Sequence, residues 1–372
     1  MRPLGLYLHI PFCKSKCGYC DFYSLPRAEE QMDDYVSALC RQLARSAPEA
    51  EAYTVDTVYF GGGTPSYLGA ERLCRLLEAV LAHYRVDAGA EITLEANPDS
   101  ARGISALRRL RAAGFNRISL GMQSADDAEL RAIGRVHTHR ETVEAVECAR
   151  AAGFENLSLD LIYGLPEQTA ARWRANLAAA LALAPEHLSC YGLKVEEGTP
   201  LYARREEAAL PDDDAQAEAY LYAASTLEAA GYAQYEISNF ARPGRESRHN
   251  LKYWTMQEYL GFGPGAHSDF GGRRFAAARD LRAFLADEER LSEDATPNAR
   301  ERLEERVMLS LRTARGLDLA ALGRPAEEAA RVLQECRAHG LAAQEQGRWR
   351  LTPQGFLLSN AIIVRVLEAL AL

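Results

Sequence analysis

Strand-like and helix-like segments alternate through the first two-thirds of this 372-residue chain, and that order restricts the fold more than any other sequence feature. Short apolar runs predict strands at residues 6–10, 57–60, 91–95, 117–122, 157–162 and 187–193. Helices are predicted at 33–45, 73–83, 104–113, in two segments before Gly153, and at 170–183 and 214–230. Consecutive strand–helix units build parallel sheets with right-handed crossovers. The fold class predicted is therefore α/β, a partial (βα)6 TIM-like barrel, because eight full repeats do not fit.

The pattern changes towards the C-terminus. Residues 232–240 predict one further strand, and residues 261–265 a glycine-rich turn. Beyond about residue 296, amphipathic helices are predicted at 301–313 and 325–339, then a two-strand ribbon at 341–351 and a helix at 352–370. We expect a partial barrel over 1–235, an extension over 236–295 and a small helical, winged-helix-like module over 296–372.

Charge and hydropathy limit the classes of partner that this chain is expected to bind. The formal net charge of -9 argues against a protein that binds nucleic acid through bulk electrostatics. Residues 296–372 carry eleven basic and nine acidic side chains, which is a weak basis for DNA binding. No apolar run approaches the length of a membrane-spanning helix, and no signal-peptide cleavage site is visible near the N-terminus. Neither nucleic acid nor an integral membrane span is expected, and the expected location is cytoplasmic.

Three of the eight cysteines form a C-x3-C-x2-C array, at Cys13, Cys17 and Cys20, in the loop after the first strand. Three such thiolates can hold three corners of a [4Fe–4S] cluster, whereas full protein ligation takes four cysteines. The open iron could then bind a small chelating molecule. Zinc is the alternative, with His9 as a fourth ligand, although the second cysteine pair typical of zinc sites is missing. The remaining cysteines, which we expect to be ordinary apolar residues, are Cys40, Cys74, Cys148, Cys190 and Cys336.

Polar residues stand where several predicted strands end. Gly61-Gly62-Gly63-Thr64-Pro65 follows the second strand, and in parallel barrels such strand ends collect the functional groups. Glu95 closes the third strand and Asp160 lies within the fifth, where a buried carboxylate needs a partner or a ligand. An internal pair between arginine and carboxylate is the alternative to a binding site at these positions.

The N-terminal motif supplies a family resemblance. Tyr7-Leu8-His9-Ile10-Pro11-Phe12-Cys13, the cysteine array and Asp21-Phe22-Tyr23 resemble the radical S-adenosylmethionine (SAM) superfamily. Within it, the chain is most similar to the branch that contains the oxygen-independent coproporphyrinogen III oxidases and the HemW heme chaperones. The resemblance extends to the C-terminal module. It implies a [4Fe–4S] cluster on the three neighbouring cysteines, and S-adenosyl-L-methionine bound to the open iron.

The resemblance also implies which residues contact SAM. They are Tyr7, Tyr19, Gly62, Gly63, Thr64, Glu95, Gln123, Arg135 and Asp160. Arg135 suits the SAM carboxylate because a guanidinium binds carboxylates bidentately. Tyr19 lies inside the cysteine loop and is expected near the adenine.

Two features distinguish the functions within that branch. The oxidases have an additional cysteine two residues after the third, where this chain has Phe22. His249-Asn250-Leu251-Lys252-Tyr253-Trp254 matches the HNxxYW motif associated with the chaperones. Imidazole is a common haem ligand, and aromatic rings offer flat surfaces to a porphyrin. His249, Tyr253 and Trp254 are therefore the predicted haem-binding residues, and His267 is a less specific candidate.

The predicted function is that of a heme chaperone, which binds haem and passes it to acceptor proteins, with a reductant for the cluster. No catalytic residue is assigned. The alternatives are an oxygen-independent coproporphyrinogen III oxidase, which Phe22 makes doubtful, and a radical SAM enzyme with another substrate.

Overall fold

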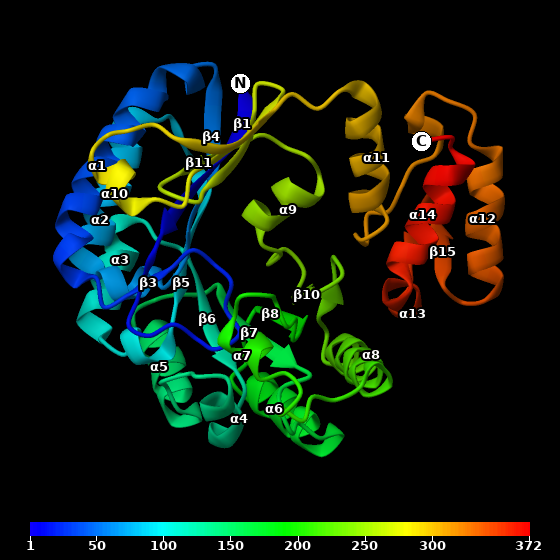
Figure 1. The fold of residues 1–372 in the computed structure, drawn as a ribbon, viewed down its shortest axis with the longest axis horizontal. Coiled ribbons are helices and arrows are strands. Elements are labelled where there is room, and N and C mark those ends of the chain that lie inside the picture. The colour runs from blue at the N-terminus through cyan, green and yellow to red at the C-terminus, as the bar shows by residue number, and fades with distance from the viewer.

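The computed structural model describes residues 1–372, and an open twelve-stranded sheet lies at its centre (Figure 1). The strand order is β14-β13-β12-β11-β1-β4-β5-β6-β7-β8-β10-β9. Six of these strands form the predicted parallel run: β1 (Arg2–Ile10), β4 (Tyr53–Gly62), β5 (Val86–Ala96), β6 (Arg117–Gln123), β7 (Leu157–Tyr163) and β8 (His187–Gly192). The predicted α/β fold with a partial six-unit barrel is confirmed, and the sheet does not close.

Helices cover the convex face of the curved sheet (Figure 1). They are α1 (Met32–Ser46), α2 (Ala70–His83), α3 (Ile104–Ala113), α4 (Asp127–Ala132), α5 (His139–Ala151), α6 (Ala170–Ala182) and α8 (Asp213–Ala229), with the short α7 (Pro200–Ala203) after β8. Five of them begin at a residue whose side-chain oxygen accepts a hydrogen bond from the first turn: Asp126, Thr138, Thr169, Thr199 and Asp212. No helix has both the length and the hydropathy needed to cross a membrane.

The central strands alternate between apolar and polar side chains, which makes the two faces of the sheet chemically different. In β6, Ile118 and Leu120 belong to the hydrophobic core of 55 buried residues beneath the helices. Arg117 and Ser119, on the other face of the same strand, line a cavity inside the barrel. The concave face is therefore a polar interior suited to a ligand, whereas the convex face holds the fold together.

The sheet continues past β1 through four strands that were not predicted. β11 (Tyr259–Phe262) pairs in parallel with β1, and β12 (His267–Phe270), β13 (Arg273–Ala277) and β14 (Leu291–Ala295) follow in antiparallel order. The segment predicted as a glycine-rich turn therefore begins inside a strand. Gly261 is required there, because a Cβ would lie 2.1 Å from the His267 carbonyl oxygen. The short helix α10 (Leu281–Leu285) lies between β13 and β14 in the chain and beside α1 (Figure 1).

One prediction in the connecting segments was wrong in detail. The single strand expected over 232–240 is a pair of short antiparallel strands, β9 (Ala233–Gln234) and β10 (Asn239–Ala241). The buried Glu236 carboxylate accepts a hydrogen bond from the Ser238 amide at 3.0 Å and turns the chain between them. The HNxxYW segment forms helix α9 (Arg248–Trp254), which lies in the hollow of the curved sheet (Figure 1).

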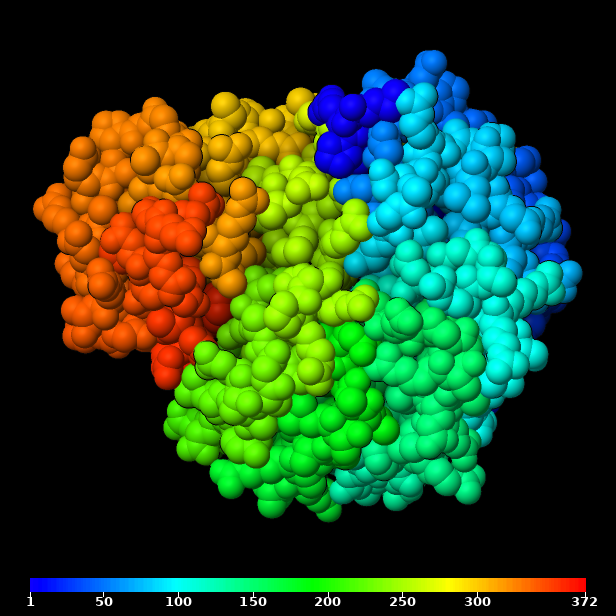
Figure 2. All heavy atoms as spheres, turned by 180° about the vertical axis from the view of Figure 1, so that it is seen from behind, coloured from blue at the N-terminus to red at the C-terminus, as the bar shows by residue number.

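The C-terminal residues form a module around a second cluster of 16 buried residues, one of which is Tyr220 of the barrel helix α8. It contains α11 (Ala299–Ser310), α12 (Glu327–Ala338), β15 (Ala342–Glu345), β16 (Arg348–Leu351), α13 (Pro353–Leu357) and α14 (Ser359–Ala369). Seen from behind, it forms a lobe beside the barrel (Figure 2). The ribbon has its predicted turn, since Gln346 and Gly347 both have positive φ.

The long helix predicted over 352–370 is interrupted at Leu358, whose φ and ψ of -108° and 14° leave the helical region. Gly355 explains the interruption, because α13 packs so closely on the ribbon that a Cβ there would meet the Leu341 carbonyl oxygen at 1.8 Å. The chain changes direction before α14 begins.

Candidate functional site

The cysteine loop lies at the carboxyl ends of the parallel strands. Cys13 ends the short strand β2 (Phe12–Cys13), which pairs with β3 (Leu25–Pro26), and all three neighbouring cysteines line one cavity of about 380 Å³. The Gly18 amide donates to the Ile133 carbonyl at 3.0 Å, and the Gly18 carbonyl accepts from the Leu201 amide at 2.8 Å. The loop is thus held by segments that follow β6 and β8.

These cysteines suit a cluster better than a single metal ion. No three His, Cys, Asp or Glu side chains converge at single-ion distances. A zinc ion would hold all the sulfurs about 2.3 Å from one point, whereas a cube places each thiolate on a different iron. His9, the candidate fourth zinc ligand, hydrogen-bonds through Nδ1 to the Tyr7 hydroxyl at 3.1 Å and through Nε2 to the Tyr23 carbonyl at 2.8 Å. With both ring nitrogens engaged, His9 is not available as a ligand.

The thiols are held in surroundings that disfavour charge until a metal binds. Burial raises the pKa of Cys13, and it raises the pKa of Cys20 to about 11. At Cys13, Thr64 and Arg135 offset part of this rise in pKa, and Thr64 Oγ1 lies 3.4 Å from Cys13 Sγ. Arg135 Nη1 also lies 3.6 Å from Cys17 Sγ. Cluster binding must therefore release protons, and the Arg135 cation stabilises the thiolates that result.

The glycines at the end of β4 allow this strand and the cysteine loop to approach each other. A Cβ on Gly63 would lie 2.8 Å from the Phe12 carbonyl oxygen and 3.1 Å from Cys13 Sγ. Gly62 has φ of 112°, and a Cβ there would lie 2.6 Å from the His9 ring. The glycines thus pack the end of β4 against the cysteine loop and bring Thr64 next to the first thiol.

Glu95 and Asp160 are half-buried carboxylates that form no direct salt bridge within 4 Å, although the charge of the nearby Arg117 acts on both of them. Glu95 accepts hydrogen bonds from the Tyr59 hydroxyl at 2.7 Å and the Gly62 amide at 3.1 Å. Asp160 accepts from the Ser119 hydroxyl at 3.2 Å. Burial raises the pKa of both groups, that of Glu95 to about 7. Both line the cavity, where a ligand with hydroxyl or amino groups would offer them further donors.

Arg135 joins the cysteine loop to the sheet. Its Nη2 donates to Asn97 Oδ1 at 2.6 Å and to the Gly121 carbonyl at 2.8 Å, while its buried Nε has no partner. Asn97 in turn donates to Thr64 Oγ1 at 3.0 Å. An unpartnered buried guanidinium nitrogen beside a cavity fits a carboxylate ligand.

Of the nine residues expected to contact SAM, eight line the same cavity as the cysteines: Tyr19, Gly62, Gly63, Thr64, Glu95, Gln123, Arg135 and Asp160. Tyr7 does not line it. Its ring stacks on Tyr59, with 6.1 Å between the centroids, and its hydroxyl contacts His9. Tyr7 therefore supports the wall of the cavity from behind.

Sequence reasoning missed other polar residues that line this cavity. They are Asn97, Arg117, Ser119, Ser189, Tyr191 and Asn250. Arg117 and Ser119 sit two residues apart in one strand, and Ser189 pairs in register with Asp160. A signal for these residues was available in the sequence. Buried parallel strands are almost continuously apolar, so polar residues at every second position of such a strand indicate that one of its faces lines a cavity.

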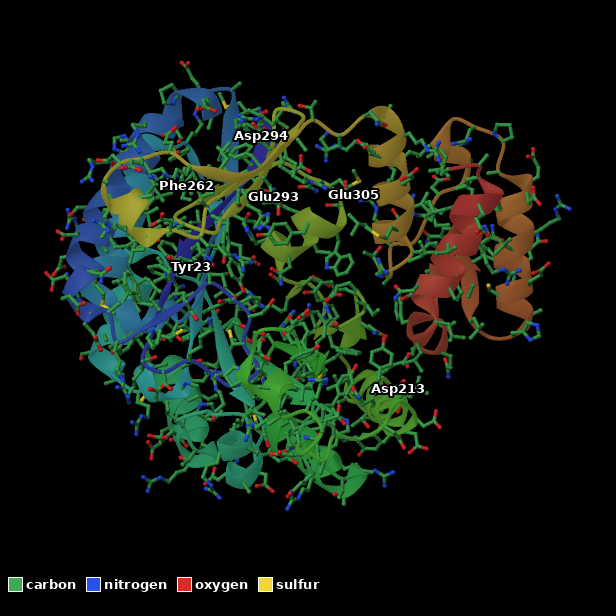
Figure 3. The ribbon with its side chains drawn as sticks, viewed as in Figure 1. Tyr23, Asp213, Phe262, Glu293, Asp294 and Glu305 are labelled. Carbon is green, nitrogen blue, oxygen red and sulfur yellow. The ribbon has the colours of Figure 1, made fainter.

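The predicted haem residues lie in different surroundings. His249 is fully buried, with Nδ1 2.8 Å from Thr57 Oγ1 and Nε2 2.8 Å from the Tyr253 hydroxyl. Burial lowers the pKa of His249 to about 3. Only Trp254, at the end of α9, lines a surface cleft. His267 is exposed and lies 3.8 Å from Glu293, which Figure 3 places on the outer strands. In this conformation neither nitrogen of His249 is free for iron.

We predict that replacing Glu95 with Gln removes a component of stability that falls with rising pH, so that the variant gains stability relative to the wild type as pH rises from about 4.5 to 7. The folded chain keeps a proton on Glu95 up to about pH 7, whereas the unfolded chain releases it near 4.5. Stability contributed by this group is therefore lost as pH rises from about 4.5 to 7, by on the order of 3 kcal/mol. Thermal unfolding midpoints of the metal-free protein between pH 5 and 8 measure the effect.

Glu236 provides the internal reference for that experiment, because burial raises its pKa to about 7 as well. Glu95→Gln should remove roughly half of the slope that the two groups produce together. An unchanged slope in Glu95→Gln would show that Glu95 is ionised in the folded chain.

Comparisons with known proteins agree with this geometry. The family profile described as Radical SAM superfamily matches residues 7–178, and the HemN C-terminal domain profile matches residues 298–358. The heme chaperone HemW of Mycobacterium tuberculosis is 40% identical, covering 97% of this chain and 94% of that protein. HemW of Escherichia coli is 37% identical over 98% of both chains, and HemW of Bacillus subtilis is 36% identical over 96% of this chain and 97% of its own.

A solved structure matches over nearly the same length. Coproporphyrinogen III oxidase (HemN) from Escherichia coli, described as a radical SAM enzyme, superposes with a TM-score of 0.85 at 26% identity. The match covers 98% of this chain and 90% of that one. The barrel and the C-terminal module therefore occur together in a known protein.

Proposed function

This chain belongs to the radical SAM superfamily and, within it, to the HemW family of heme chaperones, and from that membership we propose that it binds haem and delivers it to acceptor proteins in the cytoplasm. The observation that carries the proposal is the 40% identity to a HemW protein over 97% of the chain. Phe22 supports it, because the thiol that distinguishes the oxidase pattern is replaced by an exposed aromatic ring.

We assign the cofactors of the family to the cysteine cavity. Cys13, Cys17 and Cys20 hold the [4Fe–4S] cluster, and the polar groups around them hold SAM. When bound, the cluster supplies one-electron chemistry to SAM. An external reductant is a required partner for that chemistry.

The residues of the chain then position the ligand. Arg135 holds a carboxylate with its unpartnered Nε, and Glu95 and Asp160 accept hydrogen bonds from amino or hydroxyl groups. Tyr19 is part of the cysteine loop and lines the cavity, where its ring offers a flat surface to a planar base.

Helix α9 contributes to haem binding chiefly through its outer end. His249 and Tyr253 brace the helix against the barrel through their mutual hydrogen bond, and Trp254 is the residue of the motif that reaches a cleft. Ligation of iron by His249 would require the imidazole to leave both Thr57 and Tyr253.

A second candidate function is coproporphyrinogen III oxidation, which the similarity to the oxidase structure favours. One experiment separates the two functions. The protein, reconstituted without air, is titrated with haem and, in parallel, incubated with coproporphyrinogen III, SAM and a reductant. We expect saturable binding of one haem per chain, no protoporphyrinogen, and transfer of the bound haem to an added apo-haem protein.

His249→Ala and Trp254→Leu refine that result. Loss of the His249 hydrogen bonds should lower the thermal midpoint, because a buried hydroxyl on each side loses its partner. Trp254→Leu should weaken haem binding with little loss of stability. Robust turnover of coproporphyrinogen III, or haem binding that never saturates, would contradict the chaperone function.

A further inference from the structure

Four aromatic rings form a continuous path from the cysteine cavity through helix α9, which lies in the hollow of the sheet (Figure 1). Tyr59, on β4, lines the cavity, and its ring stacks on that of His249 with 5.1 Å between the centroids. The Tyr253 ring lies nearly perpendicular to His249 at 5.2 Å, and the Tyr259 ring, on β11, lies 4.7 Å from Tyr253. His249 is fully buried, whereas Tyr253 and Tyr259 are partly exposed. The path thus begins at the cavity and ends near the surface.

The two tyrosines that contact His249 each hydrogen-bond to an ionisable side chain. The Tyr59 hydroxyl donates to Glu95 at 2.7 Å, and the Tyr253 hydroxyl lies 2.8 Å from His249 Nε2. The other ring nitrogen of His249, Nδ1, lies 2.8 Å from Thr57 Oγ1, so the imidazole can donate there and accept at Nε2. Burial lowers the pKa of His249 to about 3, so the ring is neutral at physiological pH and Nε2 remains an acceptor.

Packing alone does not require such partners. The buried Tyr84 and Tyr232 donate to backbone carbonyl oxygens, at 3.0 Å and 2.6 Å. Tyrosine loses an electron readily only when its hydroxyl proton can leave at the same time, because an oxidised phenol is a strong acid. A hydrogen-bonded carboxyl or imidazole group can exchange that proton, whereas a backbone carbonyl cannot. Tyr59 and Tyr253 therefore have the surroundings of redox-active tyrosines, and Tyr84 and Tyr232 do not.

We propose that these rings carry oxidising equivalents out of the cysteine cavity, with Tyr59 as the entry and Tyr253 as the exit. The proposal rests on the proposed binding of SAM in the cavity, because one-electron cleavage of SAM supplies the oxidant, a carbon-centred radical. A radical that meets no substrate is then quenched before it damages the cavity. The proposal also gives His249 and Tyr253 of the HNxxYW motif a role that leaves both nitrogens of His249 engaged.

Each step moves one electron and one proton. The carbon-centred radical takes a hydrogen atom from Tyr59, so a C–H bond forms and the Tyr59 O–H bond breaks. Tyr253 then gives an electron to Tyr59, and the Tyr253 proton moves to His249 Nε2. Tyr59 regains a proton from Glu95, whose pKa burial raises to about 7, and Glu95 recovers its proton from water. Finally, a thiolate in solution gives an electron to the partly exposed Tyr253, and His249 returns the proton.

The test is electron paramagnetic resonance of the full-length protein, reconstituted without air, mixed with SAM and dithionite and frozen at intervals. We expect a tyrosyl signal that narrows when the protein is made with ring-deuterated tyrosine. The signal is divided by the amount of 5′-deoxyadenosine formed, so that it does not depend on the rate of SAM cleavage. Tyr59→Phe should abolish this ratio, because the ring remains but its hydroxyl hydrogen is gone. Tyr253→Phe should instead give a longer-lived radical on Tyr59, because the exit is blocked.

Peptide mapping after addition of a nitroso spin trap locates the radical. Adducts are expected on Tyr253 and Tyr259 in the wild type. Tyr235→Phe is the matched control, since the Tyr235 hydroxyl also lies 2.8 Å from a histidine nitrogen, that of His187 Nε2. The Tyr235 ring, however, has His187 as its one aromatic contact and does not line the cavity. The signal in Tyr235→Phe should therefore equal that of the wild type.

Three results would overturn the proposal. They are SAM cleavage without a tyrosyl signal, an undiminished signal in Tyr59→Phe, and a wild-type protein that cleaves no SAM and so forms no radical in the cavity. Circular dichroism and iron content establish that each variant is folded and carries its cluster, and Tyr253→Phe decides the question if Tyr59→Phe does not fold. Failure of the haem chaperone function would appear differently, as a protein that binds no haem while these variants behave as expected.

Discussion

Replacing Cys20 with alanine is expected to abolish the iron–sulfur cluster. The three cysteines line one cavity, no fourth is nearby, and two thiolates cannot hold a cube that already depends on three protein ligands. Iron and acid-labile sulfide, about four of each per chain in wild-type protein prepared without air, should fall to near zero in Cys20→Ala. The measurement is chemical analysis of both elements together with the visible absorption of the cluster.

Cys148→Ala is the matched control. Cys148 is also a free, half-buried cysteine, but it lies on α5 outside the cavity. Its replacement should leave iron and sulfide unchanged. Cys20→Ala protein that retained a full complement of both would contradict the ligand assignment, and zinc without sulfide in the wild type would contradict the cluster itself.

Replacing Arg135 with methionine should weaken SAM binding by about two orders of magnitude. The unpartnered Nε of Arg135 is a cationic donor beside the cavity, and loss of a charged hydrogen bond there costs up to roughly 3 kcal/mol. Arg135→Lys keeps the positive charge but loses the planar guanidinium group, so its affinity for SAM should lie between those of the wild type and Arg135→Met. Calorimetric titration of the reconstituted protein with SAM measures all three affinities.

Two further observations make that result specific. Arg131→Met should bind SAM normally, because Arg131 is exposed on α4 and does not line the cavity. Cluster content in Arg135→Met must also be measured, since Arg135 Nη1 lies 3.6 Å from Cys17 Sγ. SAM affinity that is unchanged in a variant with an intact cluster would remove Arg135 from the binding site.

The parallel core was predictable because its signal is local. A strand such as β6 and a helix such as α3 can each be recognised from a pattern within about ten residues. When such strands and helices alternate with short connections, neighbouring strands must be parallel. Strand ends in such a sheet meet at one edge, so Glu95, Gln123 and Asp160 could be expected together in one site.

The errors occur where a residue's role depends on distant neighbours. Tyr7 and His9 belong to the motif, yet they bond to each other and to Tyr23 behind the cavity wall. His249 looks like a metal ligand in the HNxxYW motif, yet Thr57, which is 192 residues away, occupies one of its nitrogens. Neither partner is visible from local spacing.

By itself, the sequence determined the barrel units, the three cluster cysteines and the polar residues at the strand ends, because periodicity and ligand spacing are properties of short segments. Only the tertiary structure decided that α9 enters the barrel, that β11 extends the sheet and that Trp254 and Arg306 line one cleft. Burial and charge pairing depend on which segments pack together, and packing follows from the whole chain at once rather than from any one stretch of it.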